Sequence, residues 1–248
     1  AKEYEAWMKE RWNHPSVVIW DAQNETWWDE TGKAIEMVRH LDLSNRPWDN
    51  GFSPPQSSTD MIESHPYLFA HDQALTFNVR REYPPEGLLA HDLGKHPEPF
   101  NDPNMYEPPA SGKYENPVII NEYGWIWLYR DGSPSSVAEP IWEFYQQFDT
   151  PEKRWEWRGR VIAAKTEYWR SRRDIAGVQH FCMLTCDRPW EPHSQVSDEW
   201  LDVKNLIMQP LFKKYVKPAF SPVGVFIDRF DRIHPSNKEI IVPVVLFN

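Results

Sequence analysis

The amino-acid sequence predicts an α/β fold in which a parallel sheet is covered by helices. Short apolar runs, typical of strands buried on both faces, alternate with helix-like segments along most of the chain. About five such strands precede a linker marked by Pro218 and Pro222. The 248 residues suffice for one large domain or for one and a half smaller ones.

The N-terminal part begins with a predicted helix over 1–13 and a continuous apolar run at 17–20, which favours a buried strand. Apolar residues at helical spacing predict a helix over 29–41. A short strand or turn at 46–48 and a strand at 61–67 follow. This succession is the repeat of a parallel α/β sheet.

A long proline-rich excursion is predicted over 68–115, and a loop of that length inside a compact domain is usually functional. The next strand is expected at 117–121. Thr150 as the cap and Pro151 as the first helical residue then predict a helix that runs to about Arg173.

The remaining segments are a predicted strand at 175–184 and a helix from Ser197 to Tyr215 that bends at Pro210. Alternating apolar residues over 223–246 indicate two strands of a separate all-β domain.

The amino-acid composition limits the kinds of molecule that the protein is expected to bind. The net charge is −10 without any basic block, so we expect neither a nucleic-acid nor an anionic-membrane surface. No apolar run approaches the ~18 residues of a membrane span. The 14 tryptophans fit a site for sugar rings, although we expect more than half of them to serve ordinary packing.

The chain opens directly in helix-like sequence and starts at Ala1, without a signal-like segment. We therefore expect it to come from the middle of a longer protein, whose compartment the sequence does not indicate.

Two acidic residues are the candidate catalytic groups in this sequence. Glu25 and Glu122 each follow an apolar, strand-like run. Carboxylates at the C-terminal tips of parallel strands can face each other across a pocket. One can then protonate a leaving oxygen while the other attacks the carbon behind it, which is the chemistry of glycoside hydrolysis. The alternative is two surface glutamates at strand ends.

The segments around both glutamates resemble those of glycoside hydrolase family 2. Arg-x-Asn-His-Pro-Ser-Val-Val-Ile-Trp at 11–20, followed by Asn24-Glu25, is similar to the acid/base segment of that family. Asn-Pro-Val-Ile-Ile-Asn-Glu-Tyr-Gly at 116–124 is similar to its nucleophile segment. The resemblance implies a retaining exo-β-glycosidase on a (β/α)8 TIM barrel, with Glu25 ending strand four and Glu122 ending strand seven.

On this mapping, residues 1–217 are a partial (β/α)8 catalytic barrel that holds strands four to eight. Residues 222–248 resemble the beginning of a C-terminal all-β, immunoglobulin-like domain. The first three barrel strands are expected in the missing N-terminal part of the same parent protein, with sugar-binding residues of their own.

The resemblance also assigns roles. Glu25 is the expected general acid/base and Glu122 the expected nucleophile. Asn24 is expected to bind the sugar 2-hydroxyl, with a turn-forming Asn as the alternative. Tyr67 is expected to donate its hydroxyl to the nucleophile carboxylate. His65, two residues earlier, either contacts the substrate or is a packed structural histidine.

Trp125 is a further candidate for substrate binding, because loops after barrel strands line the catalytic face. Trp127, Trp27 and Trp28 follow the two glutamates in the same way. His180 lies where the family often has a tryptophan at the pocket floor. No cofactor is expected to be required, and no ligand cluster in the sequence demands a divalent cation.

Two other classes of function stay open at this point. One is a non-catalytic, carbohydrate-binding barrel that has lost turnover. The other is a scaffold half that is active only when the rest of the barrel is supplied. The sequence names neither the sugar nor the oligomeric state.

Overall fold

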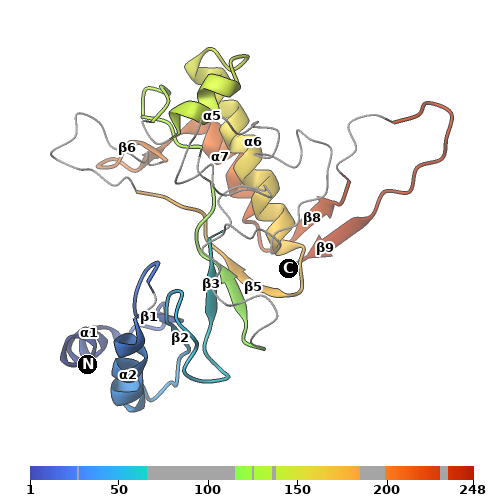
Figure 1. Ribbon diagram of the computed structural model, residues 1–248. Helices are drawn as coiled ribbons and strands as arrows, with labels where there is room; N and C mark the ends of the chain where they lie inside the picture. The colour runs from blue at the N-terminus through green and yellow to red at the C-terminus, as the bar shows by residue number, and fades with distance from the viewer. Residues whose placement is uncertain (27, 66–114, 125, 136–137, 185–198, 230–233) are drawn as a thin grey trace. The chain divides into compact units, whose positions relative to one another are not determined.

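The computed structural model shows a mixed α/β chain with several small sheets (Figure 1). It describes residues 1–26, 28–65, 115–124, 126–135, 138–184, 199–229 and 234–248. The chain divides into two compact units. The first comprises Ala1–His65, Tyr106–Asn121 and Asp174–Gly177, and the second comprises Pro66–Met105, Glu122–Arg173 and Val178–Asn248.

The described part of the first unit consists of helices and short strands. In chain order its elements are α1 (Lys2–Arg11), β1 (Trp20–Asp21), α2 (Asp29–Val38), the 3-10 turn Arg39–Leu41, β2 (Trp48–Asp49), β3 (Ile62–Ser64), β4 (Val118–Ile120) and β5 (Ile175–Val178). β1 pairs with β2 and β3 pairs with β4, both in parallel. The second sheet has the order β3-β4-β5.

Tryptophan side chains form the core between α1, α2 and the first strand pair. Trp20 and Trp48 are partners in the strand register and are both buried, with ring centroids 6.1 Å apart. Met8 of α1 and Ile35 of α2 pack against them. The Trp20 indole also donates to Asp42 Oδ2 at 2.8 Å, so the large ring is buried without losing its hydrogen bond.

Asp60 joins β2 to the start of β3. It accepts hydrogen bonds from the Trp48 and Gln56 backbone amides at 3.0 and 3.1 Å, and from both terminal nitrogens of Arg39. The Met61 amide donates to the Trp48 carbonyl at 2.9 Å. This buried carboxylate is therefore fully partnered, and its hydrogen bonds connect β2 to the segment that leads into β3.

The second unit is built on two packed helices. Its elements are α5 (Glu139–Phe144), α6 (Pro151–Arg170), β6 (Trp200–Asp202), β7 (Ile207–Met208), α7 (Pro210–Ala219), β8 (Gly224–Ile227) and β9 (Val244–Phe247). The predicted start of α6 is confirmed, because the Thr150 side chain accepts from the Lys153 amide at 3.3 Å.

A buried ion pair ties α6 to the chain before β6. Arg158 of α6 and Glu199 meet through two parallel hydrogen bonds, and both side chains are almost fully buried. The Arg158 Nε donates to the Ile126 carbonyl at 3.1 Å. A bidentate pair of this kind orients the helix as well as compensating the buried charges.

Several sequence-based expectations are corrected by the structure. The helix expected from Ser197 to Tyr215 is wrong: β6 and β7 form an antiparallel pair, and α7 begins only at Pro210. The Gln209 side chain caps the new helix by accepting from the Leu211 and Phe212 amides. Proline therefore starts a helix here and does not bend one.

The strands are shorter than predicted. β1 begins only at Trp20, and Val18 is exposed, so the run 17–20 is not a strand buried on both faces. The strand expected over 175–184 ends at Val178. α5 was not anticipated. The excursion 68–114 lies outside the described residues.

Other expectations are confirmed. The predicted helix over 29–41 is α2 with the 3-10 turn that follows it. The two C-terminal strands are β8 and β9, which pair antiparallel. Among the described residues the strands form separate small sheets and do not close into a barrel. In that part of the chain, no helix combines the length and the hydropathy that crossing a membrane requires.

The buried ion pair leads to a prediction for stability. Replacing Glu199 by Gln leaves the Arg158 guanidinium buried without its counter-charge, so we expect the free energy of unfolding to fall by about 3–5 kcal/mol. Urea unfolding at pH 7 measures this change. The matched control is Asp149→Asn, which removes an exposed partner of Lys153 and should change stability far less. Equal effects of the two variants would contradict the importance assigned to the buried pair.

Candidate functional site

Glu25 and His65 meet in the first unit, although 40 residues separate them in the chain. The His65 Nδ1 lies 3.0 Å from Glu25 Oε1, and its Nε2 lies 3.3 Å from Glu63 Oε2. The side chains of His65 and Glu63 are 3% and 0% exposed, whereas that of Glu25 is 33% exposed. A buried imidazole thus stands between a buried carboxylate and one that reaches solvent.

The loop that carries Glu25 is held against the loop after β2. The Gln23 side chain donates to the Asn50 carbonyl at 2.8 Å, and the Phe52 amide donates to the Thr26 carbonyl at 3.1 Å. Gly51 allows this approach, because it adopts a φ of 57° and a Cβ there would lie 2.8 Å from Gln23 Cγ.

Glu25 itself has a positive φ of 48°. Such a conformation costs a non-glycine residue about 1–2 kcal/mol, and it is found where surrounding contacts determine the backbone. The side chain is therefore directed by its loop and not by a regular strand. Phe52, whose ring centroid is 5.2 Å from that of His65, holds the imidazole from the other loop.

Glu63 lies on the Nε2 side of the His65 imidazole. The Asn121 side-chain amide donates a hydrogen bond to Glu63 Oε2, the same oxygen that faces His65 Nε2. The Asn121 amide and the imidazole thus approach one and the same oxygen of Glu63.

Two further carboxyl groups lie on the neighbouring strands. Asp21 and Asp49 are partners in the parallel register of β1 and β2. The side chain of Asp21 is exposed at the surface, but partial desolvation, followed by the charge of Glu63, raises its pKa to about 6. Burial, followed by the charges of Glu63 and Asp21, raises the pKa of Asp49 well above its ordinary value.

Asp49 is the least compensated member of this acidic group. The residue is 1% exposed, and neither side-chain oxygen has a well-formed hydrogen bond within the described part of the chain. The Gly51 amide lies close enough to favour the charged form only weakly. A carboxyl in this position is more stable when protonated.

Glu25 and Glu63 approach different ring nitrogens of His65, so each nitrogen has an acidic neighbour of its own.

The other candidates are placed as follows. Asn24 is exposed in the loop beside Glu25. Glu122 is buried and is the first residue after Asn121, where the second unit resumes. Because Glu25 and Glu122 belong to different units, the distance between them stays a prediction. Tyr67 and Trp125 lie outside the described residues.

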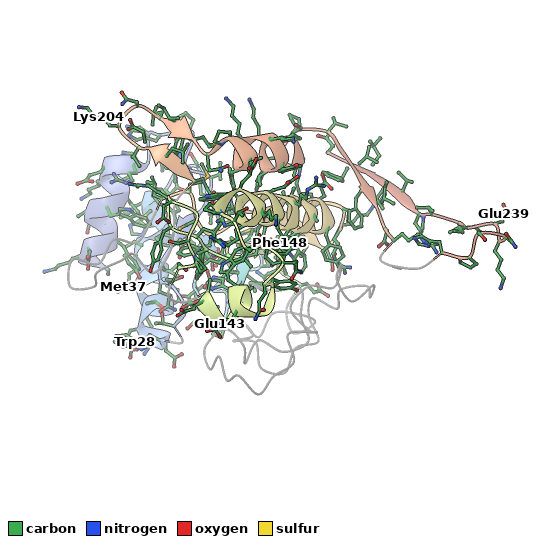
Figure 2. All side chains as sticks on the ribbon, turned by 90° about the horizontal axis from the view of Figure 1, so that it is seen from above. Trp28, Met37, Glu143, Phe148, Lys204 and Glu239 are labelled. Carbon is green, nitrogen blue, oxygen red and sulfur yellow. The ribbon has the colours of Figure 1, made fainter. Side chains whose placement is uncertain are left out.

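The remaining aromatic candidates differ in how far their side chains are exposed to solvent. Trp28 is 68% exposed and projects into solvent beside α2, as does Met37 (Figure 2). Trp127 is buried and donates from its indole to the Phe181 carbonyl at 3.0 Å, which indicates a packing role. Burial and then the Arg158 charge lower the pKa of His180 to about 3, so this histidine is neutral.

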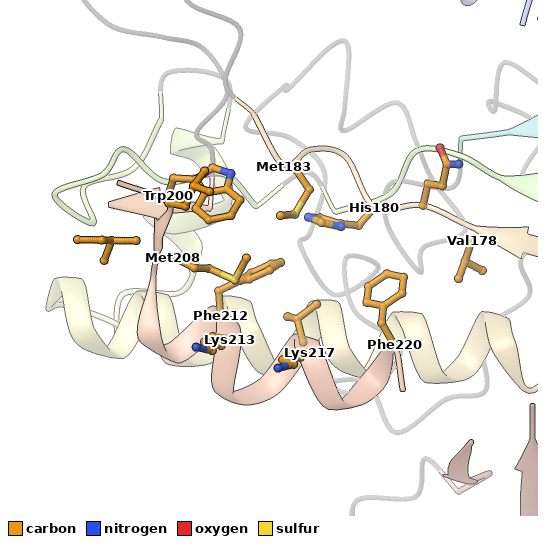
Figure 3. A pocket seen from close by; sticks show the side chains of 13 residues that line it. Val178, His180, Met183, Trp200, Met208, Phe212, Lys213, Lys217 and Phe220 are labelled. Carbon is orange, nitrogen blue, oxygen red and sulfur yellow. The ribbon is translucent and has the colours of Figure 1, made fainter. Parts of the chain in front are cut away.

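The second unit contains an apolar cavity of about 920 Å³ above α7 (Figure 3). Trp200, Met183 and His180 face Phe212 and Phe220 across it. Its described lining residues include no carboxylate, so they offer no acid and nucleophile pair for glycoside hydrolysis. Hydrolytic chemistry is better served by Glu25 and its neighbours.

Sequence reasoning missed Glu63, Asp21 and Asp49. A signal was present, because the dipeptide Trp-Asp occurs at both 20–21 and 48–49, each after an extended segment. In parallel strands the same dipeptide places like residues side by side.

Comparison with known proteins adds little at the level of sequence. No protein-family model and no curated protein matches the chain. Among solved structures, the chain is similar to a β-glucuronidase from Faecalibacterium prausnitzii, with 14% identity and a TM-score of 0.44. The match covers 87% of this chain and 34% of that chain, so this chain spans about a third of its length. A similarity of this size does not establish a family.

The buried Asp49 leads to a prediction for the pH dependence of stability. A carboxyl whose pKa is higher in the folded than in the unfolded state stabilises the fold below its unfolded pKa, and this contribution is lost as the pH rises through the folded pKa. Asp49→Asn should therefore stabilise the protein at pH 8 by about 1–2 kcal/mol and much less at pH 4. Thermal unfolding at the two pH values measures the difference.

The matched control is Asp60→Asn in the same unit, which removes the partner of Arg39 and should destabilise the fold at pH 8. A destabilisation by Asp49→Asn equal to that of Asp60→Asn at pH 8 would show that Asp49 is ionised and compensated.

Proposed function

We propose that this chain carries the catalytic carboxylates of a retaining exo-β-glycosidase of the glycoside hydrolase family 2 type. The observation that carries the proposal is the contact between Glu25 and buried His65, in a loop whose sequence resembles the acid/base segment of that family. A one-third-exposed carboxyl bonded to a buried imidazole is suited to exchange a proton with a bound substrate.

The mechanism assigns one role to each glutamate. In the first step, the Glu122 carboxylate bonds to the anomeric carbon, the bond to the leaving oxygen breaks, and Glu25 gives its proton to that oxygen. In the second step, a water oxygen bonds to the anomeric carbon, the bond to Glu122 breaks, and Glu25 takes a proton from the water. Retention requires the two carboxyl groups to lie about 5–5.5 Å apart.

The proposed architecture is the second half of a (β/α)8 barrel, with β1 to β5 as strands four to eight. The parallel pairs β1-β2 and β3-β4, in chain order, support it. Glu25 follows the first of these strands and Glu122 follows the fourth, so both would lie at the C-terminal face, where barrel enzymes carry their catalytic groups.

The proposed substrate is a terminal β-linked sugar of an oligosaccharide or glycoside. Asn24, Tyr67 and Trp125 would contact it, with the N-terminal part of the same parent protein supplying the first three strands. We propose no required cofactor, because both steps need only carboxylates and water.

The first test is Glu122→Ala. Without the nucleophile no glycosyl-enzyme can form, so we expect the variant to lose turnover of nitrophenyl β-glycosides. Both this chain and a longer protein containing it should be assayed on a panel of sugars. Added azide should not restore a product of retained configuration. The control is Glu143→Ala, at an exposed position of α5 (Figure 2), which should keep full activity.

A second test separates acid catalysis from other roles of Glu25. Glu25→Ala should slow the cleavage of poor leaving groups by about 10²–10⁴-fold and spare the first step for good leaving groups, which depart without a proton. Rates for a series of aryl glycosides measure this dependence. An equal loss across the whole series would contradict the acid role.

The alternative is a non-catalytic, carbohydrate-binding barrel. It would bind sugar through the same residues and hydrolyse none of the panel, in the wild type as in the variants. Wild-type hydrolysis that Glu122→Ala abolishes excludes this alternative.

A further inference from the structure

A hydrogen bond joins the two residues that flank the dipeptide Asn24-Glu25. The Thr26 hydroxyl donates to Gln23 Oε1 at 2.6 Å, so side chains at the first and fourth positions of this four-residue loop hold it closed. Glu25, at the third position, has a positive φ of 48°. A non-glycine residue keeps such a backbone where surrounding contacts determine it. The bond between Gln23 and Thr26 is one of these contacts.

The side-chain amide of Gln23 also binds the segment that follows β2. Its Nε2 donates to the Asn50 backbone carbonyl at 2.8 Å and to Asn50 Oδ1 at 3.2 Å. Asn50 is 2% exposed, and its own amide donates to the Pro54 carbonyl at 3.0 Å. The Thr31 hydroxyl of α2 lies 2.7 Å from Asn50 Oδ1. Gln23 is therefore bonded to a buried residue whose orientation is fixed by further partners.

The main chain on the other side of the dipeptide contacts the same segment. The Phe52 amide donates to the Thr26 carbonyl at 3.1 Å. Gly51 has a φ of 57°, and a Cβ there would lie 2.8 Å from Gln23 Cγ and 3.0 Å from the Gln23 carbonyl oxygen. The loop thus lies directly on this backbone, and a side chain at position 51 would push the two apart.

We propose that Gln23 is a positioning residue for acid/base catalysis: its side-chain amide joins Thr26 to Asn50 and so holds Glu25 in the orientation that protonates the leaving oxygen. This inference rests on the proposed glycosidase function and deepens it. Gln23 acts through the backbone that carries Glu25, and the proton transfer itself stays with Glu25. All of these hydrogen bonds lie within the first unit.

Proton transfer is sensitive to the placement of the acid, because the carboxyl must come within about 2.6–3.2 Å of the leaving oxygen. A displacement of about 1 Å can lower a rate by about 10²-fold. The Glu25 side chain is 33% exposed, and its loop lies between β1 and α2 and belongs to neither. Packing therefore restrains this loop less than it restrains a buried strand, and hydrogen bonds on both sides of the dipeptide supply the restraint.

The first test is Gln23→Met, which keeps the length of the side chain and removes its hydrogen bonds to Asn50 and Thr26. We expect kcat/KM for aryl β-glycosides with poor leaving groups to fall by about 10–100-fold, because the acid is displaced. Good leaving groups depart without a proton, so their kcat/KM should change little. The control Gln56→Met removes a side-chain bond to the Pro54 carbonyl in the same unit and should leave all rates unchanged.

A pair of substitutions at Thr26 separates the hydroxyl from the shape of the side chain. Thr26→Val has nearly the same shape but cannot donate to Gln23 Oε1, whereas Thr26→Ser keeps the hydroxyl. We expect Thr26→Val to show the same dependence on the leaving group as Gln23→Met, and Thr26→Ser to keep the wild-type rates. Combining Thr26→Val with Gln23→Met should lower kcat/KM by less than the product of the two single effects, because the hydroxyl acts through Gln23.

A further measurement needs no activity. The Phe52 amide donates to the Thr26 carbonyl, so its hydrogen exchange reports whether the loop stays on the segment after β2. Exchange at Phe52 should become about tenfold faster in Gln23→Met and stay unchanged in Gln56→Met. Exchange at Phe52 that is equally slow in the wild type and in Gln23→Met would overturn the inference.

The two proposals fail in different ways. Absence of hydrolysis by the wild type on every substrate would end the proposed function, and the exchange rates would still decide whether Gln23 holds the loop. Hydrolysis that Gln23→Met leaves unchanged, or lowers equally for all leaving groups, would overturn the role of Gln23 alone. A loss in Thr26→Ser as large as that in Thr26→Val would do the same.

Discussion

The contact of one buried imidazole with two carboxylates constrains the rest of the first unit. For His65 to reach Glu25, the loop after β1 must come close to the end of β3, and the loop after β2 packs Phe52 against the same imidazole. The bond from Gln23 to Asn50 and the left-handed turn at Gly51 bring the two loops together. The geometry of the proposed acid is thus a property of two loops and three strands, and no single motif contains it.

The strands beneath this contact are held by a different kind of acidic residue. Asp60 is as buried as Asp49, but it accepts from two backbone amides and from Arg39. Its charge is compensated and helps to build the fold. Asp49 lacks such partners among the described residues, and its burial disfavours ionisation. Two buried aspartates in one unit therefore differ: the charge of Asp60 is compensated by its partners, whereas burial disfavours the charge of Asp49.

In the second unit, a buried pair of opposite charges has a structural role. Arg158 and Glu199 satisfy each other through two bonds, and His180 beside them is neutral. The adjoining cavity is lined mainly by apolar side chains. By contrast, the carboxylates around His65 are unequally compensated, and groups of this kind are common at functional sites.

Local sequence determined much of the secondary structure. The cap at Thr150 with Pro151 after it, and the apolar spacing of α2, act within one or two turns, so the sequence alone was sufficient to place both helices. It also placed Glu25 after a strand. Tertiary structure decided that Ser197 starts no helix, since β6 pairs with β7 before Pro210 begins α7.

Tertiary structure also decided what surrounds the candidate acid. The partners of His65 lie 40 residues away at Glu25 and two residues away at Glu63, and Asn121 comes from another strand. The spacing of residues along the chain does not reveal which strands will lie side by side. Residue types at strand ends were therefore readable from the sequence, whereas the hydrogen bonds among them depended on the packing of the strands.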